Sequence, residues 1–127
     1  MKTLEIKEQG WRDFCRKAAE FCRGAMISIE LEDSGGKKTI VQDLPLQGFD
    51  LVNTETGCNT NLIVEAGLPD QKSVRHVIIE PIHIRLRNET GSDRYNRVHI
   101  SAENGTTIIQ LHPGLNQAFL EQLDLAA

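Results

Sequence analysis

Long apolar runs are absent from this chain of 127 residues. A membrane-spanning helix needs about 20 consecutive apolar residues, whereas the longest apolar runs here extend over only a few. The opening string MKTLEIKEQGW carries acidic residues and lacks the apolar stretch of a signal peptide. The sequence therefore predicts no membrane partner, and we expect the protein in the cytoplasm.

Cysteine is scarce, because the chain has only Cys15, Cys22 and Cys58. Three cysteines are too few for a disulfide framework. Cys15 and Cys22 lie ~10 Å apart along a predicted helix, which exceeds the ~7 Å between Cα atoms that a disulfide allows. We interpret these two as small buried hydrophobic residues and Cys58, in a polar stretch, as an exposed free thiol.

Recognisable catalytic and cofactor motifs are also missing. The chain has no GxSxG elbow, no Rossmann or P-loop glycine pattern, and neither HExxH nor CxxC. Three histidines, His83, His99 and His112, fall on strand positions that could share a face, but the surrounding arginines repel a divalent cation. These absences favour a non-enzymatic protein with no cofactor and no metal.

Strong positive charge is missing as well. The formal net charge is −4, and Trp11 and Tyr95 are not interleaved with arginines, so the sequence predicts no nucleic-acid partner. Hydrophobic residues make up 39% and charged residues 25% of the chain, close to the globular average. With this length, the composition predicts a single domain over residues 1–127.

Two stretches have the apolar spacing of helices. The first extends from about residue 9 to 23, ends at Gly24, and carries the apolar stripe Trp11, Phe14, Cys15, Ala18, Phe21 and Cys22. The second is a short C-terminal helix with Leu115, Phe119 and Leu123 on one side. These apolar stripes exceed what a thin sheet needs, which favours self-association.

Between the helices, the period changes to that of strands. We expect strands over residues 25–32, 39–43, 49–52, 61–66, 73–87 and 95–102 and a last one that follows Asn104-Gly105 and ends at Pro113, with breaks at Pro45 and Gly48 and a bulge, bend or edge at Pro81. The predicted fold class is α+β: a curved antiparallel sheet of about six strands, with the first helix packed on it and a short C-terminal helix.

Asn104-Gly105 predicts a two-residue type I′ hairpin. The register that follows pairs Val98 with Leu111 on the core face and Arg97 with His112 on the other face. His76 has the parity of the apolar residues around it, so we expect a histidine at the edge of the core with a hydrogen bond to the backbone.

Basic residues concentrate in residues 72–99, which hold six basic and three acidic residues, a formal charge of +3. Alternation directs His83, Arg85, Arg87, Arg97 and His99 away from the core. Two registers are possible: one pairs His83 with His99 and Arg85 with Arg97, and the other pairs Arg85 with His99 and Arg87 with Arg97. Directly opposed cations destabilise a strand pair, so acidic side chains, an anionic ligand or exposure to water should offset them.

This face is the candidate ligand site. Its proposed ligands are carboxylate or phosphate groups, bound by Arg85, Arg87, Arg97, His83, His99 and His112. The alternative is a solvated sheet face or one that an oligomer covers.

Four short strings occur in order along the chain: Trp11-x2-Phe14, Asp43-Leu-Pro-Leu46-x-Gly48, His76-x-Ile78-x2-Pro81 and Glu103-x-Gly105-Thr-Thr107. Together they resemble a family of short bacterial proteins classed as a domain of unknown function. The resemblance implies a small soluble α+β domain and carries over no catalytic residue.

Two functions remain in view. The first is a non-enzymatic binding or interaction module that self-associates. The second is a small-ligand protein or enzyme that binds an anionic group on the Arg/His face. A deep pocket ringed by Arg85, Arg97 and His99 would favour the second function, and a flat exposed face would favour the first.

Overall fold

A computed structural model describes residues 2–53, 60–88, 94–103 and 105–123 of the chain. Its strands are β1 (Lys2–Ile6), β2 (Met26–Asp33), β3 (Gly36–Asn53), β4 (Thr60–Ala66), β5 (Val74–Ile79), β6 (His83–Asn88), β7 (Tyr95–Ala102) and β8 (Gly105–Leu115). Its helices are the 3-10 turn η1 (Glu8–Gly10), α1 (Trp11–Phe21) and α2 (Gln117–Glu121). Neither α-helix is long or apolar enough, within these ranges, to cross a membrane.

The predicted fold class, α+β with a sheet of about six strands, is wrong. The described residues form one antiparallel sheet of eight strands, and the α-helices span only 11 and 5 residues. The short strand β1 was not expected, because Lys and Glu interrupt its apolar residues. The stretch 73–87 forms two strands, because Glu80, with φ of 50°, and Pro81 interrupt the ladder.

The long strand β3 bends the sheet. Its first part pairs with β2 and its last part with β4. At the bend, Asp43 has φ of 50°, and its backbone N–H donates to Ser28 Oγ at 3.1 Å. A register shift between Leu46 and Gly48 follows. The break expected at Pro45 and Gly48 is therefore a bend within one continuous strand.

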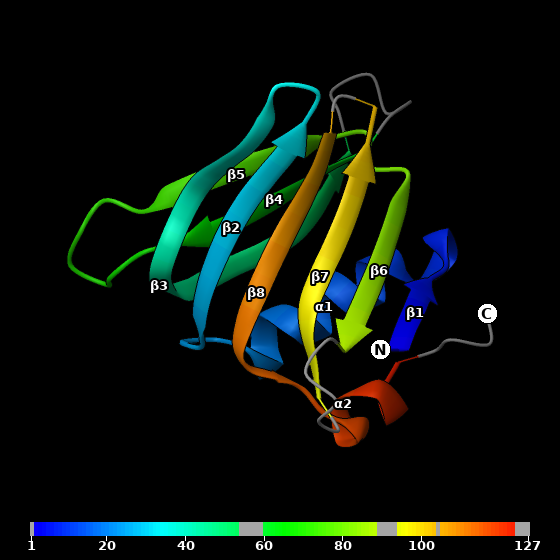
Figure 1. Ribbon diagram of the computed structural model, residues 1–127. Helices are drawn as coiled ribbons and strands as arrows, with labels where there is room; N and C mark the ends of the chain where they lie inside the picture. Colours follow the sequence, from blue (N-terminus) through cyan, green and yellow to red (C-terminus); the bar gives the residue numbers. More distant parts are fainter. Residues whose placement is uncertain (1, 54–59, 89–93, 104, 124–127) are drawn as a thin grey trace.

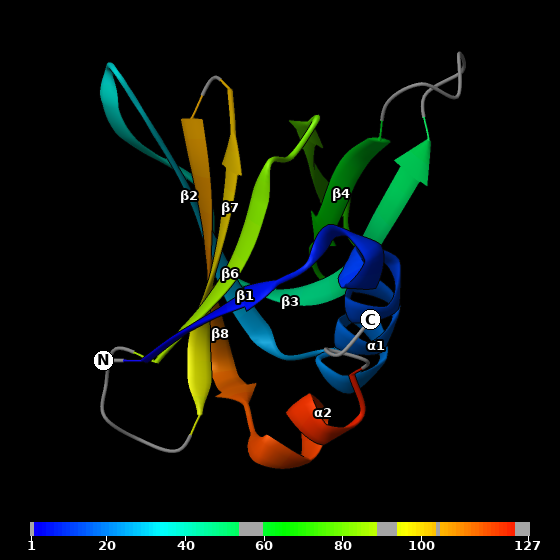
Figure 2. The same cartoon turned by 90° about the vertical axis from the view of Figure 1, so that its right-hand side faces the viewer.

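The bend divides the sheet, whose strand order is β1-β6-β7-β8-β2-β3-β4-β5, into two layers. The front layer contains β1, β6, β7, β8, β2 and the first part of β3, and the back layer contains the last part of β3, β4 and β5. Figure 1 shows β4 and β5 behind the front strands. Figure 2 shows α1 and β4 on the opposite side of the molecule from β7 and β8, with α2 below.

The two helices cover the core on the side away from β7 and β8 and from below (Figure 2). Phe14 of α1 packs edge-to-face on Phe49 of β3 and Phe119 of α2, with ring centroids 5.9 and 6.1 Å apart. Trp11 is also buried, and its Nε1 donates to the carbonyl of Ile6 at 2.9 Å. In α2, Asn116 caps the first turn by accepting from the Phe119 N–H. The apolar residues of both helices thus mostly serve the protein's own core; Phe21 of the predicted stripe is the exception, with 42% of its surface exposed.

The β7–β8 hairpin differs in register from the prediction. Asn104 lies outside the described residues, but Ala102 pairs with Gly105, and Val98 pairs with Ile109 rather than Leu111. Gly105 belongs to the ladder: its φ is 150°, and a Cβ there would lie 2.8 Å from the Glu32 carbonyl oxygen of β2. The pairing is thus shifted by two residues from the predicted one, which preserves the inward and outward faces.

The described cysteines lie in the core. Cys15 and Cys22 are both buried and free. Burial raises the pKa of Cys15 to about 12 and that of Cys22 to about 11. Both thiols therefore stay protonated at neutral pH and act as small apolar side chains. Cys58 lies outside the described residues.

Candidate functional site

The outer face of the front layer carries the predicted basic residues. Ile84, Leu86, Val98 and Ile100 point into the core, and their neighbours on β6 and β7 lie on the opposite face. We call this set the basic front face; it consists of His83, Arg85, Arg87, Arg97 and His99. All five residues are half-buried.

The second of the two possible registers is present. Arg87 pairs with Arg97, Arg85 with His99, and His83 with Ser101. Cations are therefore directly opposed on neighbouring strands, as the sequence predicts. Arg87, Arg97 and His99 each make further interactions within the chain.

Glu5 of β1 neutralises one end of this face. Arg85 Nε donates to Glu5 Oε1 at 2.8 Å, and His83 Nδ1 lies 2.8 Å from Glu5 Oε2. The hydrogen bonds from His83 and then Arg85 hold the pKa of Glu5 below its usual range. Sequence reasoning missed Glu5, because β1 pairs with a strand about 80 residues away and its short pattern gives no separate signal.

His112 lies on the outer face of the same layer but not opposite Arg97. It pairs with Met26 at the start of β2 and is exposed, whereas Arg97 pairs with Gln110. The same register separates the three histidines considered as metal ligands. Among the described residues, no three His, Cys, Asp or Glu side chains lie close enough to hold a metal ion.

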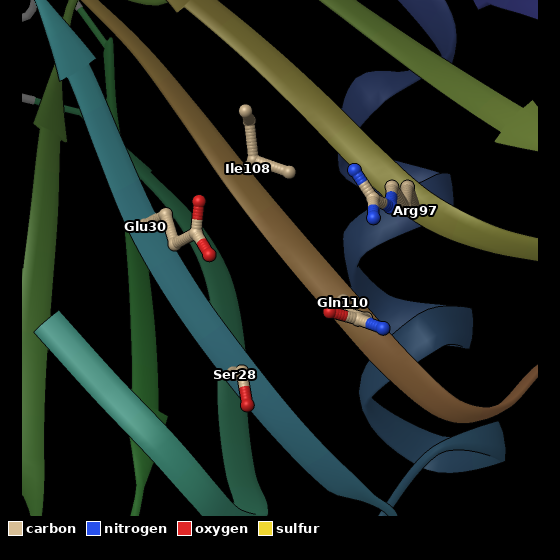
Figure 3. A pocket seen from close by; sticks show the side chains of 5 residues that line it. All are labelled: Ser28, Glu30, Arg97, Ile108 and Gln110. Atoms are coloured by element: carbon tan, nitrogen blue, oxygen red, sulfur yellow. The ribbon is translucent and has the colours of Figure 1, made fainter. Parts of the chain in front are cut away.

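A small hollow lies beside Arg97 on the basic front face (Figure 3). The side chains of Glu30 and Ser28 on β2 and of Gln110 and Ile108 on β8 complete its lining. Figure 3 shows these side chains on the side of the sheet away from α1. The hollow has a volume of about 20 Å³, which is enough for a single water molecule. The described part of this face is therefore flat and holds no deep pocket of the kind that would favour a small-molecule site.

The outer face of the back layer has a different character. Val77 of β5 pairs with Ile63 of β4, and Ile79 and Val52 both flank Asn61. We call the four apolar residues, Val52, Ile63, Val77 and Ile79, the apolar back face. Three of them are well exposed, Val52 to 38%, Val77 to 43% and Ile79 to 60%.

His76 lies on the inner side of β5, at the edge of the core. Its Nε2 lies 3.0 Å from the Thr107 Oγ1 of β8, so the histidine contacts the front layer. Its expected position at the core edge is confirmed, but the partner is a side-chain hydroxyl rather than the backbone. Burial lowers the pKa of His76, which keeps the ring neutral at physiological pH.

Comparisons with family models, curated proteins and solved structures found no match for this chain. The resemblance to a bacterial domain family, based on four short strings, therefore stays a prediction. The arguments for function depend on the two outer faces of the sheet.

Proposed function

We propose that the protein is a non-enzymatic interaction module of the cytoplasm that binds a second copy of itself through the apolar back face. One observation carries the proposal: Val77 and Ile79, and Val52 on the far side of Asn61, are 38–60% exposed on one sheet face. Exposed apolar side chains that gather on one face are typical of an interaction surface. The flat basic front face adds support, because it lacks the pocket that binding of a small molecule at its arginines would need.

The charges around the apolar back face favour a second copy as the partner. Arg75 and Glu65 lie beside it, with Arg75 Nε 3.8 Å from Glu65 Oε1, and Asp50 lies in the row of Ile63 and Val77. A two-fold dimer brings the same patch of both copies together. Because the rim carries both signs, Arg75 of one copy can face a carboxylate of the other while the apolar side chains cover one another.

The position of β5 makes this face accessible. Within the described ranges, β5 pairs with β4 alone, and it is the last strand of the sheet. Arg75 and Pro81 flank its apolar run, and such residues limit open-ended strand addition at an edge. We therefore expect a closed dimer rather than a fibre. The small number of apolar side chains implies a modest interface and a dimer that dissociates on dilution.

Sedimentation velocity over a wide concentration range tests the proposal. The unmodified chain should change from monomer to dimer as its concentration rises. Ile79→Lys places a charge at the most exposed apolar position, so it should keep the chain monomeric over the same range. Because Ile79 is largely exposed, the variant should keep the circular dichroism spectrum of the parent chain.

Met26→Lys is the matched control. Met26 is as exposed as Val77, 42% against 43%, but it lies at the start of β2 and outside the apolar back face. This variant should dimerise like the unmodified chain. A chain that is monomeric at every concentration, or a dimer that Met26→Lys disrupts and Ile79→Lys does not, would overturn the proposal.

A further inference from the structure

A second hollow lies where the bend of β3 meets two turns of the chain. The turn between α1 and β2 contributes Arg23 and Gly24 to its lining, and the turn after β4 contributes Gly67 and Pro69. Residues 45–47 of the bend complete the lining. The volume of this hollow is about 290 Å³, far larger than that of the hollow on the basic front face.

Hydrogen bonds hold both turns against the bend. The Gly24 N–H donates to the Leu46 carbonyl at 3.1 Å, and the Gly67 N–H donates to the Pro45 carbonyl at 3.0 Å. Gln47 Nε2 donates to the Gly67 carbonyl at 2.9 Å. The walls of the hollow are therefore in place before a ligand arrives, which lowers the entropic cost of binding.

The lining of this hollow is mostly apolar. Its two prolines have no N–H, and its two glycines have no side chain to fill the space. A Cβ at Gly24 would meet no other part of the chain within 4 Å. An apolar side chain that enters the hollow leaves water and gains free energy, so the hollow suits a group of this kind.

Arg23 is the one charged residue of this lining. It is exposed, and it forms no ion pair with any residue that the structure describes. Glu20, three residues earlier, and Asp70, next to Pro69, both lie outside the lining. A carboxylate on the ligand would therefore meet an available guanidinium, and guanidinium groups pair well with carboxylates.

We infer that this hollow binds a peptide segment of a partner protein in which an apolar side chain lies next to a carboxylate. The apolar side chain enters the hollow, and the carboxylate pairs with Arg23. A peptide fits better than a free small molecule, because the hollow is open to solvent and small-molecule pockets enclose most of their ligand.

The hollow is separate from the apolar back face. Gly67 follows Ile63, the nearest apolar residue of that face along β4, by four residues, or about 13 Å of extended chain. Peptide binding at the hollow therefore leaves the proposed dimer contact free, and the inference does not rest on the dimer.

Titration of the ¹⁵N-labelled chain with short blocked peptides tests the inference. A peptide of alternating leucine and glutamate should give saturable shifts at the N–H groups of Arg23, Gly24, Gln47 and Gly67. A peptide of alternating leucine and lysine should bind about fivefold more weakly, because it offers Arg23 no carboxylate. A peptide of alternating serine and glutamate should bind about tenfold more weakly, because it has no apolar side chain for the hollow.

Arg23→Glu should weaken binding of the leucine–glutamate peptide by about fivefold or more and strengthen binding of the leucine–lysine peptide. Arg16→Glu is the matched control, because it changes the net charge equally at an exposed residue of α1 that lies outside the hollow and pairs with Asp13. It should change the affinity for either peptide by less than about twofold. Ile79→Lys, the variant designed to prevent dimerisation, should bind the peptides like the unmodified chain.

Three results would overturn the inference. The first is equal affinity for the glutamate and lysine peptides, and the second is an equal effect of Arg23→Glu and Arg16→Glu. The third is tight binding of isovalerate, a free carboxylate with the branched carbon chain of leucine, because equal affinity for it and the leucine–glutamate peptide would indicate a small-molecule site.

Discussion

The two outer faces of this sheet expose different kinds of side chain to water. On the front layer, β6 and β7 place basic side chains outward, and Glu5 contacts two of them, His83 and Arg85, at 2.8 Å. On the back layer, β5 places Val77 and Ile79 outward, and no element among the described residues covers them. Solvated charges need no partner, whereas an uncovered apolar surface gains free energy when a partner removes it from water. This contrast is why we propose the back layer, rather than the front layer, as the surface for protein association.

The largest expected effect is a difference in stability between substitutions on the inner and the outer side of β5. Ile78→Ala removes a buried side chain and should lower the free energy of unfolding by about 2–5 kcal/mol. Ile79→Ala, one residue further along and 60% exposed, should cost less than about 0.5 kcal/mol in the monomer. Urea denaturation of the two variants at low protein concentration measures both values. Equal losses would show that Ile79 is not an outward residue.

The second effect tests the register of the β7–β8 hairpin in the front layer. Gly105→Ala introduces a Cβ 2.8 Å from the Glu32 carbonyl oxygen at φ of 150°, so it should destabilise the fold by more than about 1 kcal/mol. Gly35→Ala is the control, because its Cβ would meet only the Asp33 side chain, at 3.3 Å. If thermal unfolding shows the same small change for both variants, Gly105 is a free turn residue and the register is wrong.

The third effect concerns the contact between the layers at His76. Because burial lowers the pKa of His76 in the folded chain, the unfolded chain takes up the proton first as the pH falls. The free energy of unfolding should therefore decrease as the pH drops below about 6.5. In His76→Gln, which cannot titrate, this part of the decrease should vanish. Chemical denaturation at several pH values would contradict the account if the two chains lost stability in parallel between pH 7 and 5.

The smallest effect concerns Glu5 on the front layer. Its pKa is lowered in the folded chain, so its contribution to stability is present above pH 4.5 and is lost as the pH falls through the folded pKa. Because the pair is exposed, Glu5→Gln should cost less than about 1 kcal/mol at pH 7. The difference between the two chains should shrink below pH 4.5. A difference that persists at pH 2 would mean that Glu5 acts through packing rather than charge.

Strand alternation predicted the orientation of the basic front face without deciding between the two registers. Arg85, Arg87, Arg97 and His99 share a face in either register, because a slip of two residues preserves parity. The pairing of Arg97 with Gln110 goes with Gly105 in the ladder close to Glu32 of β2, a contact between residues distant in the chain. No local pattern contains this information. The same limit applies to Glu5, whose strand pairs with β6.

The apolar back face was not predicted, although the inward parity expected for His76 implies that Val77 and Ile79 face outward. Val77, Ile78 and Ile79 are consecutive apolar residues, so the sequence alone does not say whether another element covers the outer side of the strand. The bend in β3 decides this, because it turns the back layer over the core and leaves one side of β5 outside. The bend itself rests on Asp43 and its contact with Ser28, 15 residues earlier in the chain.

A dilution series followed by ¹H–¹⁵N correlation spectra tests the central claim most directly, since it locates the contact as well as detecting it. On dilution, the signals of Val52, Ile63, Val77 and Ile79 should shift together, and those of Arg85, Arg87, Arg97 and His99 should stay in place. Concentration-dependent shifts confined to the basic front face, or no shifts at any concentration, would contradict the assignment of association to the back layer.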